Sequence, residues 1–159
     1  MFAKWDTMAM ISEERTWRMK RKERTQILIH CPLDFLTLLK QKIESEHPVR
    51  IVEDPQLSLV MVKMRESAQS SLFYLTEMVV SECKAEVEGV LGIGILQENQ
   101  LEKSLCLAVI DAAYNASLKC CEQLTAMIRE QGQLQQKQRI QENKQILKTR
   151  VSFETMDKE

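Results

Sequence analysis

Residues 88–97, which read EGVLGIGILQ, decide the fold of this chain together with the apolar segment that follows them. The pair Glu88–Gly89 is typical of a tight hairpin turn, because glycine adopts a positive φ without a steric penalty from Cβ. Residues 90–96 are predicted to form a strand. Gly92 and Gly94 lie inside it, where glycine commonly marks a bulge or the close approach of another backbone, and we favour this structural role over contact with a ligand.

A buried helix is predicted directly after that strand. Asn99 is a residue type that caps helices, and Glu102 stands three positions later, as in a capping box. Residues 105–110 are apolar on most sides of the helix, so the helix should be buried. Asp111 follows them. Because an unpaired buried carboxylate is costly, Asp111 must turn to the helix flank, find a donor or serve a site, and we favour structural pairing over catalysis.

Strands are predicted upstream of this unit. Residues 49–53 are rich in β-branched side chains and stop at the turn pair Asp54–Pro55. Residues 57–65 are almost continuously apolar, which predicts a strand covered on both faces. Residues 72–88 form a long extended run whose last part alternates between apolar and charged side chains, as in a half-buried strand. With residues 90–96 this makes four strands.

Helices are predicted on both sides of these strands. One ends near His30 and the next begins at Pro32, because proline is tolerated in a first helical turn but not in a helix interior. After the buried helix the apolar periodicity continues to Ile128, and Gly132 is expected to break or kink it. Residues 131–145 are rich in glutamine and charge, so this helix is either solvated or laid against a partner.

The predicted order is therefore two helices, four strands and two helices. Short connections between consecutive strands favour an antiparallel meander. We expect an α+β fold in which the N- and C-terminal helices cover a four-stranded antiparallel meander sheet. The domain should span residues 24–156, and residues 1–23 form a basic N-terminal extension.

A basic run marks this extension and its junction with the domain: Arg18, Lys20, Arg21, Lys22 and Arg24. One interpretation is a segment that binds nucleic acid or an acidic partner, and another is a loosely attached helix whose charges are solvated. We favour the second, because no further basic patch extends the surface, and we therefore expect no nucleic-acid binding. A third interpretation is that translation begins at Met8 or Met19.

The amino-acid composition limits the classes of protein to which the chain can belong. The chain has 159 residues, of which 44% are hydrophobic and 28% charged, with a net charge of −1, as in a soluble globular domain. No apolar run approaches the roughly 20 residues that span a bilayer, and no signal-peptide pattern precedes Ile27, so we expect a cytoplasmic protein without a membrane segment. Five scattered cysteines without a C-x-x-C pair are expected to be buried free thiols rather than disulfides or metal ligands.

The usual catalytic and metal-binding patterns are missing from the sequence. The histidines, His30 and His47, lie 17 positions apart with no cysteine or acid at ligand spacing, so no metal site is expected. Neither a phosphate-binding loop nor a nucleophile elbow occurs, and no catalytic residue is assigned. Arg150 is a candidate for contact with a partner or a phosphate, because guanidinium groups bind oxyanions, and a solvated surface arginine is the alternative.

Two motifs resemble those of a known family. The first consists of Gly89, Leu91 and Gly92, followed after eighteen residues by Asp111–Ala112. The second lies at the C-terminus and consists of Arg150, Val151, Phe153, Thr155 and Met156. Together they are similar to the PhnG family, the G subunit of the carbon–phosphorus lyase system, and the resemblance covers about residues 24–156.

The resemblance implies a small subunit of the carbon–phosphorus lyase core complex, beside subunits of the H, I and J types. With the H, I and L types, such a subunit is required to replace the adenine of ATP by an alkylphosphonate, and the J type later cleaves the product. ATP and alkylphosphonate are then substrates of the complex, and this chain alone binds no cofactor. The candidates for contact with partners or substrate are Asp111, Arg150, Val151, Phe153 and Met156, and the 131–145 helix is expected to dock on another chain.

Two departures indicate a divergent member. The family often has Gly-Arg-Asp where this chain has Glu98, Asn99 and Gln100, so the basic residue of that turn is lost. In the tail an aromatic residue is replaced by Glu154, and the arginine–glycine end is missing. The alternative from another functional class is a non-enzymatic interaction or scaffold protein that homodimerises through the same apolar and tail surfaces.

Overall fold

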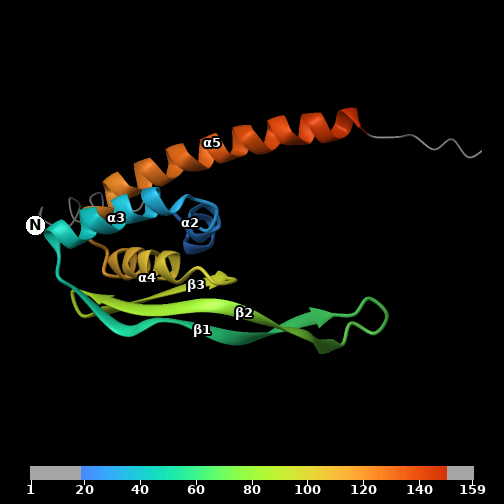
Figure 1. Ribbon diagram of the computed structural model, residues 1–159, viewed down its shortest axis with the longest axis horizontal. Helices are drawn as coiled ribbons and strands as arrows, with labels where there is room; N and C mark the ends of the chain where they lie inside the picture. Colours follow the sequence, from blue (N-terminus) through green and yellow to red (C-terminus); the bar gives the residue numbers. More distant parts are fainter. Residues whose placement is uncertain (1–18, 150–159) are drawn as a thin grey trace, which may run out of the picture.

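The computed structural model describes residues 19–149 of the chain. Its elements, in chain order, are helices α2 (Arg21–Leu28) and α3 (Leu33–Glu46), strands β1 (Val49–Arg65), β2 (Leu72–Val87) and β3 (Val90–Gln97), and helices α4 (Leu101–Asn115) and α5 (Cys121–Lys148). Figure 1 shows α4 on one face of the sheet, with α3 and then α5 stacked above it and α2 beside it. The predicted α+β class and the antiparallel sheet are confirmed.

The sheet has three strands in the order β1-β2-β3, and both neighbouring pairs are antiparallel. Glu88 and Gly89 adopt positive φ values of 50° and 76°, which form the two-residue hairpin turn that the sequence predicts between β2 and β3. Buried and exposed residues alternate along β3, so one face of the sheet joins the core while the other faces outward.

The prediction of a fourth strand is wrong, because residues 49–65 form one strand instead of two. No turn forms at Asp54–Pro55. The chain runs through both residues, with register shifts between Ile51 and Glu53 and between Glu53 and Gln56. Such bulges let a strand absorb a residue that cannot pair. β1 is also an edge strand, where proline is tolerated because an N–H that faces away from the sheet needs no ladder partner.

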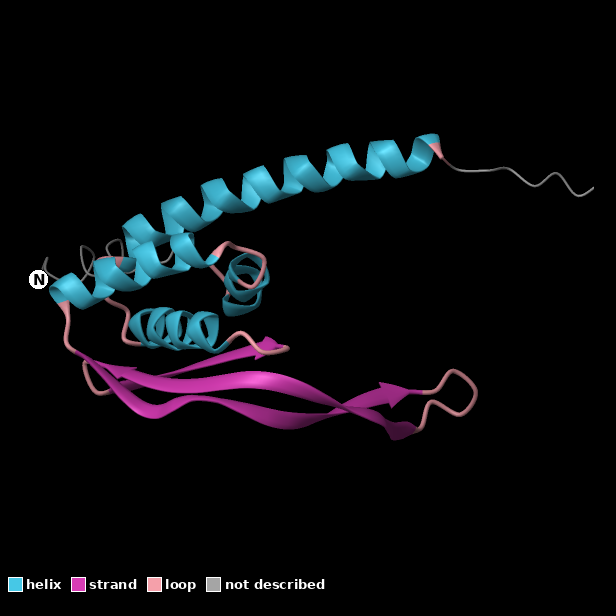
Figure 2. Ribbon diagram, viewed as in Figure 1, coloured by secondary structure: helices cyan, strands magenta, loops and turns pink. Residues whose placement is uncertain are grey.

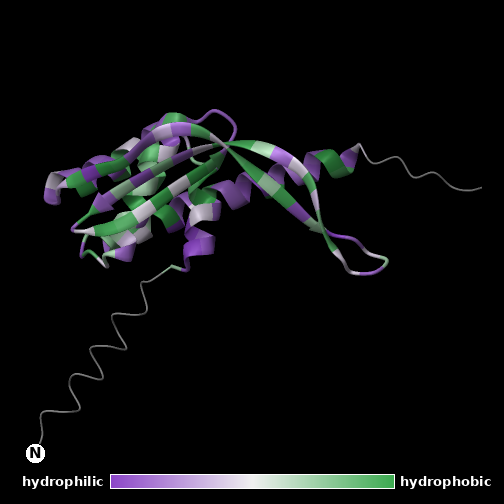
Figure 3. Ribbon diagram, turned by 90° about the horizontal axis from the view of Figure 1, so that it is seen from below, coloured by the Kyte–Doolittle hydropathy of each residue, from purple (hydrophilic) through white to green (hydrophobic). Residues whose placement is uncertain are grey.

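The outer part of β1 and β2 runs past β3 as a two-stranded ribbon (Figure 2). The last residue of β3 pairs with Val80, so residues 59–79, which we name the hairpin arm, have no third strand within the described part of the chain. The expectation that residues 57–65 are covered on both faces is therefore wrong. Leu59 is 63% exposed and Met61 is 58% exposed. Figure 3 shows apolar residues along both strands of the arm.

Helix α4 is buried as predicted, but its start differs from the prediction. The residues from Cys106 to Tyr114 are all shielded from solvent. The helix begins at Leu101, and no side chain of its own caps it. Instead, the backbone N–H of Gln100 donates to the Ser81 hydroxyl (2.7 Å), which itself donates to the carbonyl of Glu98 (2.7 Å). The capping box of Asn99 and Glu102 is therefore replaced by a cap from strand β2.

Two glycines of β3 allow α4 to lie directly on the sheet. A Cβ placed on Gly92 would stand 2.6 Å from the Cα of Ala112, and one placed on Gly94 would stand 2.7 Å from the backbone nitrogen of Ala108. Real Cβ atoms do not approach other backbones so closely. The close backbone packing predicted for these two glycines is confirmed.

Helix α5 runs without a break through Gly132, so the predicted break is wrong. This glycine lies where α5 meets α2: a Cβ there would stand 2.8 Å from the Cδ1 of Ile27. The side-chain amide of Gln135 donates to the carbonyl of Ile27 (3.2 Å) at the same crossing. Beyond it, Leu134, Ile140 and Ile146 are between 47% and 65% exposed. Docking of the 131–145 helix on another chain stays a prediction.

Candidate functional site

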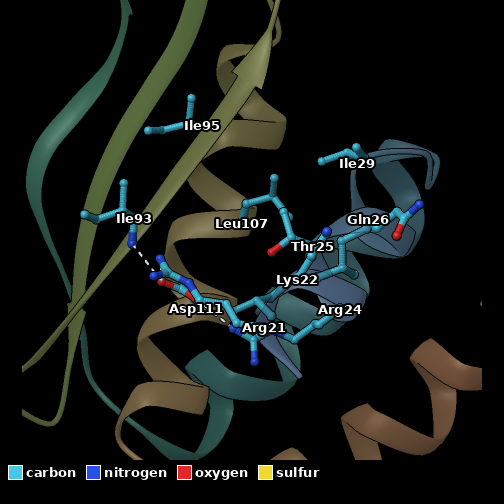
Figure 4. A pocket seen from close by; sticks show the side chains of 12 residues that line it. Arg21, Lys22, Arg24, Thr25, Gln26, Ile29, Ile93, Ile95, Leu107 and Asp111 are labelled. Carbon is cyan, nitrogen blue, oxygen red and sulfur yellow. Dashed lines mark hydrogen bonds and ion pairs between the residues drawn. The ribbon is translucent and has the colours of Figure 1, made fainter. Parts of the chain in front are cut away.

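Asp111 is the centre of a polar cluster that joins α4, α2 and β3 (Figure 4). Its carboxylate accepts hydrogen bonds from Nε of Arg21 (3.0 Å) and Nη2 of Arg21 (2.7 Å). It also accepts one from Nη2 of Arg24 (2.7 Å) and one from the backbone N–H of Ile93 (3.3 Å). The side chain of Asn115, one turn later on α4, donates to the same carboxylate (3.3 Å). The structural pairing favoured for Asp111 is confirmed.

The two arginines of the cluster differ in their environment. The Arg24 side chain is 5% exposed, and its guanidinium lies 4.0 Å from the centre of the Tyr114 ring, so it is held by an ion pair on one side and an aromatic face on another. Burial lowers the pKa of Arg24, and the charge of Asp111 opposes that change. The Arg21 side chain is 62% exposed and forks onto both carboxylate oxygens. Arg24 is therefore a core group, whereas Arg21 reaches the surface.

This pairing corrects one interpretation of the sequence. The basic run was expected to carry solvated charges on a loosely attached helix, and for Arg24, which is buried, that is wrong. The Arg21 side chain is 62% exposed, as expected of a solvated charge, but it is also paired with Asp111. Both arginines belong to α2 and bind a residue about ninety positions later in the chain. The buried position expected for Asp111 favoured a structural partner, but sequence spacing could not indicate which residue it would be.

An open pocket of about 660 Å³ adjoins the cluster, between α2, α4 and the outer edge of β3. Figure 4 shows Arg21, Lys22 and Asp111 toward one end of it, with Ile95 and Ile29 further along. Most of the pocket surface is apolar, although half of the lining residues are polar or charged. The lining consists of Arg21, Lys22, Arg24, Thr25, Gln26, Leu28, Ile29, Ile93, Ile95, Leu107, Ile110 and Asp111. The pocket therefore offers an apolar wall with positive charge at one end.

A comparison with known families shows to which family the chain belongs. The model of a family described as "Phosphonate metabolism protein PhnG" matches residues 19–158. The chain belongs to the PhnG family. It is therefore a phosphonate metabolism protein, and the resemblance carried by its two motifs is confirmed. No curated protein sequence matches it.

The PhnG match starts upstream of α2, so it includes Arg21 and Arg24 as well as Asp111. Four residues of the C-terminal motif, Arg150, Val151, Phe153 and Met156, fall within the match but lie outside the residues that the structure describes. Their role in contact with partners or substrate stays a prediction, as does any such role of Asp111. None of the helices within residues 19–149 has the length and apolar character needed to cross a membrane.

The cysteines of this PhnG-family chain are buried free thiols, as predicted. Burial raises the pKa of Cys121 to about 12 and that of Cys83 to about 11. The hydroxyl of Tyr114 shares a hydrogen bond with Thr125 (2.8 Å), and burial raises its pKa to about 12. Because a thiolate or phenolate is the reactive form, these groups are inert near neutral pH.

We expect these raised pKa values to weaken the fold at high pH. Cys121 and Tyr114 are neutral in the folded chain up to about pH 12, whereas their ordinary pKa values are 9.0 and 10.0. The unfolded chain therefore loses protons first, and stability is full below about pH 9 and falls as the pH rises toward 12. Guanidinium chloride titrations under reducing conditions at several pH values measure this. In Cys121→Ala the fall should be shallower, and an unchanged slope would contradict the assignment.

One further group of polar side chains comes together only in three dimensions. Donor atoms of Glu46, His47 and Cys120 lie within 4.8 Å of one another, and they are the group within residues 19–149 that could hold a metal ion. Nδ1 of His47 is 2.9 Å from the carboxylate of Glu88. Nitrogen, sulfur and oxygen donors of this kind suit zinc, but Glu46 is exposed and its carboxylate is free to stay in water. The proximity of Cys120 to His47 could not be predicted from the sequence, because the two residues are far apart in the chain.

Proposed function

We propose that this chain is a non-autonomous subunit of the carbon–phosphorus lyase complex. With subunits of the H, I and L types it would support transfer of ribose triphosphate from ATP to an alkylphosphonate, with adenine displaced, before cleavage by the J type. ATP and alkylphosphonate would be substrates of the complex, which would act in the cytoplasm, and this chain would bind no cofactor by itself. Membership of the PhnG family supports the proposal.

The observation that carries the subunit role is the apolar surface of the hairpin arm. Nine large apolar residues of the arm are between 36% and 63% exposed: Leu59, Val60, Met61, Met64, Leu72, Phe73, Tyr74, Leu75 and Val79. Two-stranded ribbons are at best marginally stable in water, and exposed apolar patches of this kind mark interaction sites. A partner that covers the arm would stabilise the ribbon and remove its apolar side chains from water.

The polar groups within residues 19–149 support a role without a complete active site in this part of the chain. Asp111, the buried carboxylate beside the pocket, is already bonded to two arginines and a backbone amide. The buried thiols have raised pKa values, so they are poor nucleophiles. The described residues therefore offer a surface for assembly with partner subunits rather than reactive side chains.

The test of the function is reconstitution. The full chain is co-expressed with the H, I, J and L subunits, and release of adenine from ATP in the presence of an alkylphosphonate is measured. We expect release by the complete set, and none by the set without this chain or by this chain alone. Adenine release by the isolated chain, or undiminished release without it, would refute the subunit role.

The arm itself gives a second test, in which a double variant is compared with a matched control. Leu59→Ser with Met61→Ser removes apolar surface that is already exposed, so the isolated chain should keep its stability within about 1 kcal/mol, as surface substitutions usually do. Capture of this variant by the partner subunits should fall at least about tenfold, as for loss of central contacts in an interface. Leu38→Ser is the control, because Leu38 is 44% exposed on α3, away from the arm. Equal capture of the unmodified chain, the double variant and Leu38→Ser would contradict the role of the arm.

The alternative is a non-enzymatic scaffold protein that homodimerises through the same apolar and tail surfaces, to which the hairpin arm would belong. It predicts a stable dimer of the isolated chain in gel filtration and no capture by the other subunits. Under the subunit proposal, the partner subunits compete successfully for the arm.

A further inference from the structure

The outer edge of β3 is an unpaired strand edge within residues 19–149. β3 lies at the end of the sheet and pairs only with β2. The backbone N–H of Ile93 donates away from β2, to Asp111, and the carbonyl of Leu91 accepts from the side chain of Asn115 (3.0 Å). Because hydrogen-bonding directions alternate along a strand, the N–H and C=O groups of Ile95 face the same outer edge.

Side chains of α4 occupy the first half of this edge, and the pocket adjoins the second half. Asn115 donates to the carbonyl of Leu91, and Asp111 accepts from the N–H of Ile93. Ile93 and Ile95 line the pocket. Across the pocket lies Ile29, the residue that follows α2, and α4 contributes Leu107 and Ile110. The pocket is therefore a groove that has a strand edge on one side and apolar side chains around it (Figure 4). A strand edge recognises extended backbone, and the apolar wall recognises the side chains that it carries.

The positive charge at one end of the groove limits which kind of polypeptide segment can bind there. Three cationic side chains, Arg21, Lys22 and Arg24, line the pocket with a single anionic one, Asp111. Arg24 is buried, but Arg21 is 62% exposed and Lys22 is exposed. An acidic side chain placed there would meet a net positive charge, because the single carboxylate of Asp111 does not balance three cations. A second copy of β3, with the sequence VLGIGILQ, has no charged residue within the strand itself.

We propose that an extended segment of a partner subunit adds to β3 as a fourth strand. It pairs with the outward N–H and C=O groups of Ile95, places apolar side chains against Ile29 and Leu107, and sets an acidic side chain beside Arg21 and Lys22. The inference rests on the proposed role as a subunit of a complex and names the place where a partner strand binds. It is separate from the hairpin arm, which lies at the far end of β2.

The first test removes one outward donor without touching the β2–β3 ladder. Proline is tolerated on an edge strand where the lost N–H faces away from the sheet, so Ile95→Pro should leave the isolated chain folded, which circular dichroism and thermal melting check. Ile95→Val is the matched control, because it keeps the N–H and a β-branched side chain. We expect Ile95→Pro to bind the co-expressed subunits roughly tenfold more weakly than Ile95→Val, as for one lost backbone hydrogen bond. Equal affinity of the two variants would overturn the proposal.

The second test addresses the charge. Lys22→Glu reverses a cation that lines the groove, and Lys119→Glu makes the same change on an exposed residue between α4 and α5. Only Lys22→Glu should weaken binding of the partner subunits, and the difference should shrink in high salt because exposed charges are screened. Equal effects of the two substitutions would refute an acidic partner side chain at this end.

Hydrogen exchange separates failure of this inference from failure of the proposed function. In the complex, the outward-facing amide of Ile95 should exchange at least about tenfold more slowly than in the isolated chain, because pairing with the partner strand protects it. If the complex forms and the hairpin arm is protected while residues 90–97 are unchanged, the function stands and the groove inference is wrong. If no partner subunit binds the chain, both are wrong. Protection that appears in the isolated chain and grows with its concentration would assign the edge to a second copy and overturn the proposal.

Discussion

Gly92→Ala is expected to cost about 3 kcal/mol of unfolding free energy or more, and to leave little folded chain at 37 °C. The added Cβ, which is fixed to the backbone of β3, would stand 2.6 Å from the Cα of Ala112 and would collide with the backbone of α4. Neither side can move by a rotamer change. Relief requires α4 to lift from β3, which opens the layer between sheet and helix that holds the core. Chemical denaturation followed by circular dichroism measures the loss.

Two other glycines provide controls for this prediction. A Cβ at Gly89 meets nothing within 4 Å, but its φ of 76° disfavours alanine, so Gly89→Ala should cost about 1–2 kcal/mol. At Gly132 the added Cβ meets only the end of the Ile27 side chain, which can turn away, while alanine favours the helix by about 1 kcal/mol. Gly132→Ala should therefore be close to neutral. If Gly92→Ala were as mild as Gly132→Ala, the contact between β3 and α4 would be looser than described.

Asp111→Asn is the second substitution with a large expected effect, about 3 kcal/mol of lost stability, as is typical when one partner of a buried ion pair is removed. The change keeps the shape of the side chain but removes its charge, and Arg24 is then left buried without a counter-ion. An amide also turns two donors toward a guanidinium that has only donors to offer. Arg21 can regain water because it is largely exposed, so most of the loss comes from Arg24.

A double-mutant cycle with Arg24→Met isolates this pair. Methionine fills the space of the arginine stem without needing a counter-ion, so the double variant should be more stable than Asp111→Asn alone. Glu44→Gln is the surface control. It breaks the exposed pair with Lys40 on α3 and should cost less than about 0.5 kcal/mol. A loss for Asp111→Asn that is no larger than for Glu44→Gln would contradict the structural role of the cluster.

Several features of the fold could be predicted because they depend on neighbours in sequence. The turn at Glu88–Gly89 follows from the φ that glycine permits, and the burial of α4 follows from its apolar residues. The role of Gly92 and Gly94 follows from the rarity of glycine inside a strand. The errors came where a local signal was overruled. Asp54–Pro55 is a turn pair in isolation, but the long pairing of β1 with β2 carries the chain through it.

The candidate site could be predicted only in part. The apolar surroundings of Asp111 favoured structural pairing with a donor, because a buried carboxylate without a partner is costly. The identity of that cation could not be predicted, since a charged residue on a helix end has the same local signal whether it meets water or a carboxylate. Likewise, the continuous apolar run of β1 suggested a covered strand, whereas the arm that it forms extends past every other described element of the sheet.

By itself, the sequence determined the class of fold, the β2–β3 turn, the buried helix, the buried thiols and the PhnG family. The tertiary structure alone decided that Arg21 and Arg24 pair with Asp111, that Ser81 caps α4, and that β3 offers an open edge beside an apolar groove. The physical reason is the range of the interactions. Backbone preference and apolar periodicity act between residues a few positions apart, whereas ion pairs, caps and strand edges depend on which distant segments the folded chain brings together.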